Sequence, residues 1–260
     1  HPQAEIAETF ITYINELPAT QNKIDMEEEL TINNQNNFAE EIEDLYRLHY
    51  ITKKYDHIIE YEKGAWKLFE PSKFIYAYFA FNSFYNFDWN ESLKNRKLTV
   101  FPKKYENEKE IEPSESQKYK AMIDFIFSKV DNDDKELFLK MIKGKNTIDG
   151  IIEIISRITP DNRITESERE NFKKEFENLL KSNEIKSGKL KNDIIRFIYM
   201  VRNNIFHGTK DTIKMSEVFQ RKRLDIYSNI IIAVNELLFK VLEKEGWFSP
   251  QKKYCLKIHS

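Results

Sequence analysis

Arg202, Asn203 and His207 carry side chains that together can cleave a phosphodiester bond. The planar guanidinium of an arginine binds phosphate through paired hydrogen bonds and stabilises the charge that builds on it. A histidine titrates near neutral pH, so it can take a proton from an RNA 2′-hydroxyl or return one. An asparagine amide can orient the phosphate or the histidine. We therefore predict a catalytic site that acts on RNA and needs neither a metal ion nor a cofactor.

The spacing of these residues constrains their surroundings. Each residue of an α-helix turns by about 100°, so five positions separate Arg202 and His207 by roughly 140°. The two side chains can converge where the helix ends or bends near Asn204, or where two copies of the segment meet. Gly208 suits a helix C-terminus. The alternative is that these residues only cap the helix, because arginine and protonated histidine favour its negative end.

Residues 202–208 read Arg-Asn-Asn-Ile-Phe-His-Gly, and this run resembles the signature of the HEPN domain family. That signature is an arginine, four to six residues and a histidine, with a polar residue directly after the arginine. The variant Arg-Asn, three residues, His-Gly matches at every fixed position. The helical context from about 66 to 248 is also similar, whereas residues 1–65 are not covered.

The resemblance implies a helical bundle with the motif near the end of its third main helix. It also implies a homodimer whose two motifs share one cleft, and a metal-independent ribonuclease that leaves a cyclic phosphate, often a toxin or phage-defence effector with an antitoxin or other regulatory partner. Ile205, Phe206 and the last helix would supply the apolar dimer surface. Two alternatives stay open: a non-catalytic module that binds nucleotide or a partner protein, and a plain helical scaffold.

Other candidate residues carry weaker signals. Arg221, Lys222 and Arg223 open the last helix and could hold the RNA backbone, although a solvated turn is equally consistent with them. The histidines and the cysteine outside the motif lack metal-ligand spacing or an adjacent base, and a run of three glutamates is expected to be solvated: His49, His57, Cys255 and residues 27–29.

Charge is distributed unevenly along the chain. Residues 1–60 contain 13 acidic and 4 basic residues, whereas residues 186–260 contain 15 basic and 7 acidic ones. The basic C-terminal third could attract a polyanion, and the acidic N-terminal part could not. There is one cysteine, no apolar run of membrane-spanning length and no signal-peptide pattern. We therefore expect a cytoplasmic protein.

The apolar residues recur at helical spacing along most of the chain, and only 6 Gly and 7 Pro interrupt it. The predicted fold is therefore all-α. We expect an acidic helical extension at 1–65, a HEPN-like helical domain at 66–250 and a tail at 251–260. Residues 94–160 hold an insertion or extra helices, beginning with a surface loop to 117. Helices are expected at 38–49, 73–89, 118–130, 135–143, 148–158, 165–180, 190–206 and 216–245. Thr165 and Glu168 are expected to form a capping box at the start of the helix 165–180, and Gly188 is expected to break the chain.

Overall fold

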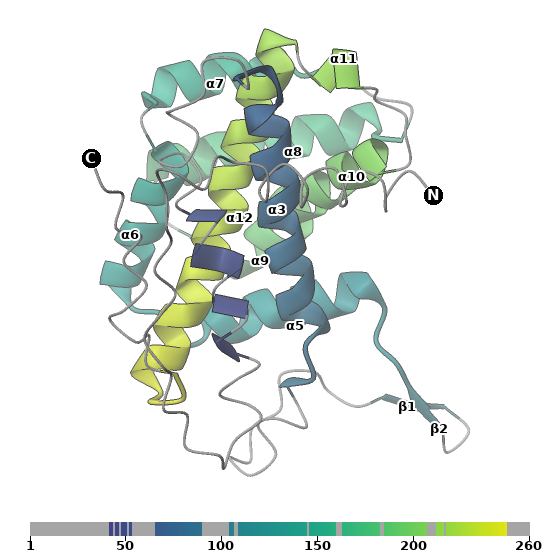
Figure 1. Ribbon diagram of the computed structural model, residues 1–260, viewed down its shortest axis with the longest axis vertical. Coiled ribbons are helices and arrows are strands. Elements are labelled where there is room, and N and C mark those ends of the chain that lie inside the picture. Colours follow the sequence, from purple (N-terminus) through teal and green to yellow (C-terminus); the bar gives the residue numbers. More distant parts are fainter. Residues whose placement is uncertain are drawn as a thin grey trace, which may run out of the picture.

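The computed structural model describes most of the chain beyond residue 65 and part of the helix before it. The described residues are 42–43, 45–46, 48–50, 52–53, 66–89, 104–106, 109–144, 146–159, 163–182, 185–206, 212–215 and 217–248. They are predominantly helical, which confirms the predicted all-α class (Figure 1). Most of the predicted N-terminal extension, at residues 1–41 and 54–65, and the predicted tail after residue 248 lie outside the described residues.

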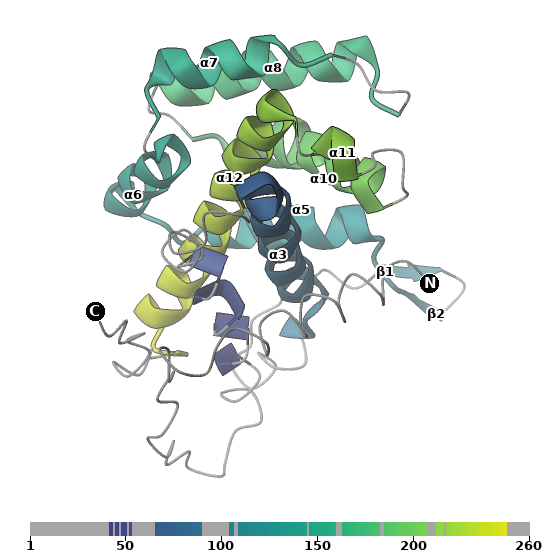
Figure 2. The ribbon, with the colours of Figure 1, turned by 45° about the horizontal axis from the view of Figure 1, so that its top comes forward.

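The helices surround one long central helix, α12 (Val218–Lys244). Its residues are buried on nearly all sides, which explains why apolar side chains occupy most positions from Ile226 to Leu242. The helix α3 (Trp66–Asn86) and the helix α6 (Asn132–Lys143) flank it on opposite sides (Figures 1 and 2). Burial of α12 therefore joins parts of the chain that are far apart in sequence.

The remaining elements complete this arrangement. In Figure 2, α7 and α8 form a layer above α12, while α5 extends to the right at mid-height, toward the two strands. The further helices are α5 (Glu115–Phe127), α7 (Ile148–Ser156), α8 (Glu166–Ser182), α9 (Ser187–Lys189), the π-helical turn η2 (Leu190–Ile194), α10 (Ile195–Phe206) and α11 (Thr212–Met215). The short strands β1 (Lys104–Glu106) and β2 (Lys109–Ile111) pair antiparallel, with Tyr105 opposite Glu110, where the sequence predicted only a loop.

Local capping sets several helix ends. The predicted capping box at α8 is present, with the Glu168 amide donating to the Thr165 hydroxyl at 3.2 Å and the Thr165 amide donating to Glu168 at 3.0 Å. Helix α5 begins three residues before the predicted start, because Ser114 and Gln117 cap it in the same way. Gly188 was expected to break the chain but lies inside α9, so the helical run before α10 begins earlier than predicted.

The described part of residues 42–53 is helical and packs against the C-terminal half of α12. Ile42 is fully buried, and Tyr46 and His49 contact the ring of Phe239 at centroid distances of 4.8 and 5.2 Å. The Nε2 of His49 donates to Glu236 at 2.8 Å, and Lys53 pairs with the same carboxylate at 2.7 Å. This helix therefore belongs to the same packed core as α12.

Acidification is expected to destabilise the fold through His49. Burial lowers the pKa of His49 below its usual 6.5, against the opposing hydrogen bond and charge of Glu236. The unfolded chain then binds a proton that the folded chain does not, so the free energy of unfolding falls as pH drops below 6.5. Burial alone would raise the pKa of Glu236, but the hydrogen bond and charge of His49 and the charge of Lys53 lower it to about 2, so it stays ionised near neutral pH.

Chemical denaturation at about pH 7.5 and about pH 5.5 measures this effect. The variant His49→Gln keeps a donor for Glu236 but does not titrate. We expect the loss of stability on acidification to be smaller in His49→Gln than in the unmodified protein. An equal loss in both proteins would show that another group is responsible.

Candidate functional site

The helix α10 carries Arg202 and Asn203 in its last full turn and ends at Phe206, as predicted. Its inner face is fixed by stacking of Phe197 on Phe172 of α8, with ring centroids 3.9 Å apart and planes inclined by 10°. Tyr227 of α12 contacts both rings edge-on at 5.9 Å. Aromatic pairs of this kind fix both the separation and the rotation of the helices that carry them. Arg202 and Asn203 consequently occupy a fixed place beside α3.

Arg202 lies between two aromatic rings. Its guanidinium carbon is 5.0 Å from the ring centre of Phe206 and 5.4 Å from that of Tyr78 on α3. Its Nη1 donates to Asn203 Oδ1 at 2.8 Å, and its Nε is buried without a hydrogen bond among the described residues. The flat guanidinium stacks on aromatic faces in a way that the compact lysine ammonium does not. The cation is thus held in one orientation at the surface of α10.

A carboxylate and two tyrosines lie next to this pair. Glu115, in the first turn of α5, accepts from the Tyr85 hydroxyl at 2.5 Å and from the Tyr199 hydroxyl at 2.8 Å. Tyr199 stands one turn before Asn203 on α10, and the Asn203 side chain hydrogen-bonds to it. A continuous set of contacts therefore runs from Glu115 through Tyr199 and Asn203 to Arg202.

The tyrosines in this set keep their protons at neutral pH. Burial raises the pKa of Tyr85, and the neighbouring Tyr78 and Glu115 raise it further. Burial also raises the pKa of Tyr78, which the charge of Arg202 only partly opposes. The pKa of Tyr199 is raised by burial too, against the opposing hydrogen bond from Asn203. The hydroxyls of Tyr85 and Tyr199 therefore donate to Glu115, and that of Tyr199 accepts a hydrogen bond from Asn203.

The structure places the other predicted site residues as follows. His207 and Gly208 lie outside the described residues. Ile205 is 9% exposed and packs in the core, so the expectation that it supplies apolar dimer surface is wrong. Phe206 is half-buried against Arg202.

The basic run at the start of α12 does not form one surface. Lys222 is exposed, whereas Arg221 and Arg223 are half-buried, each with a buried Nε. Arg223 donates to the backbone carbonyl of Arg157 and borders a cavity that Asn204 of the motif also lines. This cavity of about 30 Å³ has room for one or two waters and not for a nucleotide. Of the three residues, only Lys222 presents its full side chain to solvent.

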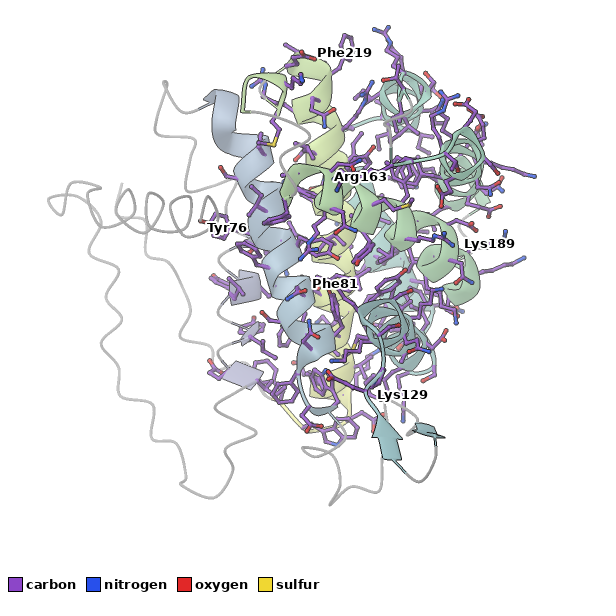
Figure 3. The ribbon with its side chains drawn as sticks, turned by 90° about the vertical axis from the view of Figure 1, so that its right-hand side faces the viewer. Tyr76, Phe81, Lys129, Arg163, Lys189 and Phe219 are labelled. Atoms are coloured by element: carbon purple, nitrogen blue, oxygen red, sulfur yellow. The ribbon has the colours of Figure 1, made fainter. Side chains whose placement is uncertain are left out.

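A larger cavity of about 260 Å³ lies between α8 and the π-helical turn, where Lys189 pairs with Glu175 and Asp193. Figure 3 shows Lys189 on the side of the molecule away from α3, whereas Arg202 contacts α3. None of the predicted site residues lines this cavity. It is therefore separate from the site at the end of α10.

Two features are absent from the described part of the chain. There, His, Cys, Asp and Glu side chains form no group of three that could hold a metal ion. No helix in those residues has the length and apolar character that crossing a bilayer requires. His57, Cys255 and residues 27–29 lie outside that part.

Sequence reasoning missed Glu115, Tyr85 and Tyr199. They come from α5, α3 and α10, and nothing in their local sequence patterns marks them as neighbours. Comparisons with known protein families, curated proteins and solved structures find no match for this chain.

Proposed function

We propose that the chain is a metal-independent endoribonuclease built on a HEPN-like helical bundle. The observation that carries the proposal is Arg202, clamped between Tyr78 and Phe206 and hydrogen-bonded to Asn203, within the run Arg-Asn-x3-His-Gly. A fixed guanidinium at a helix surface suits an RNA phosphate, whose charge grows in the transition state. The all-helical fold agrees with the proposal.

In the proposed reaction, His207 removes the proton from an RNA 2′-hydroxyl. The 2′-oxygen attacks the adjacent phosphorus, the bond from phosphorus to the 5′-oxygen breaks, and the 5′-oxygen takes up a proton. The products are a 2′,3′-cyclic phosphate and a 5′-hydroxyl. Arg202 stabilises the additional negative charge on the phosphoryl oxygens, and Asn203 holds Arg202 in orientation through the 2.8 Å hydrogen bond.

We further propose that two copies of the chain pair so that both motif segments face one cleft, as the resemblance to the HEPN family implies. One copy alone separates Arg202 and His207 around a regular helix, so a second copy would complete the site.

Incubation of the purified protein with single-stranded RNA in excess chelator tests the proposed activity. We expect cleavage to continue, with cyclic-phosphate and 5′-hydroxyl ends detected by end-specific labelling. Loss of cleavage in chelator, restored by Mg²⁺ or Mn²⁺, would overturn the metal-free mechanism. Light scattering with site-specific cross-linking near residue 202 tests the pairing, and a stable monomer that cleaves RNA would contradict it.

A further inference from the structure

Phe79 is exposed although it lies on a helix whose other aromatic residues are mostly buried. Its side chain is 39% exposed, whereas Phe74, Tyr78 and Phe81 on α3 are at most 1% exposed. Exposing a phenylalanine forgoes the free energy of burying it. Among the described residues, the other large apolar side chains this exposed are Val218 and Phe219, at the first turn of α12.

The neighbours of Phe79 connect it to the candidate site. Its ring centre is 5.6 Å from that of Phe206, with the two planes inclined by 43°. Phe206 in turn contacts the guanidinium of Arg202 at 5.0 Å. Tyr76 meets the Phe79 ring edge-on at 6.1 Å, and Figure 3 shows Tyr76 on the outer side of α3. An exposed aromatic ring thus stands one ring away from the cation that the proposed reaction places on phosphate.

We infer that Phe79 and Phe206 form a stacking site for an unpaired nucleobase of the RNA whose neighbouring phosphate binds Arg202. The inference rests on the proposed function, because it takes Arg202 as the phosphate-binding group. An aromatic ring offers a flat apolar face to any base, and single-stranded RNA exposes the faces that a duplex keeps stacked. The site would therefore select single-stranded or looped RNA and tolerate different bases.

The surroundings of Phe79 fit a nucleic acid better than a protein surface. On the part of α3 that follows Phe79, the partly or fully exposed side chains are polar: Asn82, Ser83 and Asn86. Lys118 of α5 reaches Asn86 at 3.4 Å, and its ammonium pairs with Glu112 at 2.6 Å. A protein interface core requires a contiguous apolar patch. An exposed ring beside a guanidinium, with amides and a hydroxyl on one side and the partly exposed Ile75 and Tyr76 one turn earlier on α3, matches a base, a phosphate and polar groups of RNA.

Binding of a fluorescent single-stranded 2′-O-methyl RNA tests the inference with the full-length chain. This probe lacks the attacking hydroxyl, so binding is measured without cleavage. We expect Phe79→Ala and Phe79→Leu each to raise Kd about tenfold, and Phe79→Trp to stay near the unmodified protein. Phe219→Ala is the matched control, because Phe219 is similarly exposed (43%) but its ring contacts the guanidinium of Arg157. It should leave Kd within about twofold.

The outcomes separate this inference from the proposed function. If the protein binds the probe through Phe79 but cleaves no unmodified RNA, the stacking site stands and the ribonuclease proposal fails. If RNA is cleaved and Phe79→Leu binds and cleaves normally, the ribonuclease proposal stands and the stacking site fails. Equal affinity for a duplex of the same sequence, or a dimer that becomes monomeric in Phe79→Ala by light scattering, would also overturn the stacking site. The last result would assign Phe79 to a contact with a second copy.

Discussion

His207→Ala is expected to lower kcat for RNA cleavage by roughly 100- to 10,000-fold, because it removes the group that takes the proton from the 2′-hydroxyl. The helix content should stay unchanged, since the core depends on the apolar faces of the helices. Single-turnover cleavage and circular dichroism measure both properties. A folded His207→Ala protein that cleaves at the original rate would remove this histidine from the mechanism.

Arg202→Lys is the companion variant in the same assay. Lysine keeps the positive charge but loses the flat fork that stacks on Tyr78 and Phe206 and reaches Asn203. We expect kcat to fall by about 100- to 1,000-fold with a smaller change in KM, as for the loss of a group that stabilises the transition state. Full activity with lysine would mean that charge alone is sufficient and that the clamped orientation has no catalytic role.

Asp225→Ala is expected to lower the free energy of unfolding by about 2–4 kcal/mol. The side chain of Lys73 on α3 is 3% exposed, and its ammonium donates to Asp225 of α12 at 2.8 Å and to Asn229 at 3.1 Å. Removal of Asp225 takes away the opposite charge and leaves the ammonium buried between the two helices. Because Asn229 still accepts a hydrogen bond from Lys73, the expected loss lies below the largest values found when one partner of a buried ion pair is removed.

Urea denaturation of a small set of variants measures this effect. Lys73→Met removes the buried cation and leaves Asp225, whose side chain is 29% exposed and can be solvated, so its cost should be smaller, about 1 kcal/mol. In a Lys73→Met background, Asp225→Ala should cost little more. If Asp225→Ala costs the same with and without Lys73, the two side chains are not energetically coupled.

Helix positions were largely predictable because periodicity and capping are local properties of the sequence. The predicted end of α10 at Phe206 and the capping box at Thr165 are both confirmed. The exposure of Phe79 was not predictable in this way. Its position on α3 is compatible with a wide apolar face that is buried throughout. Only the packing of α10 and α12 against α3 shows that the described residues leave the ring partly uncovered.

The candidate site was predictable only in part for a related reason. Arg202 and Asn203 are adjacent in a recognisable run, so their side-chain chemistry could be read directly. Glu115 contacts Tyr85 and Tyr199, which are 30 and 84 positions away from it in the sequence. Such pairs form only once the helices are packed. The contact between Tyr78 and Arg202 was not predictable either. The helical spacing of Tyr78 indicated a core residue and gave no sign of a neighbouring cation.

The central position of α12 has a consequence for synthesis of the chain on the ribosome. Roughly 130 residues separate the end of α3 from the start of α12, which a ribosome adds in about 7–26 s. During that time the apolar face of α3 lacks the helix that it packs against in the finished fold. Arg202 emerges before α12, when neither α3 nor α10 has its final support. A nascent chain would therefore stay without an assembled site until α12 has been translated.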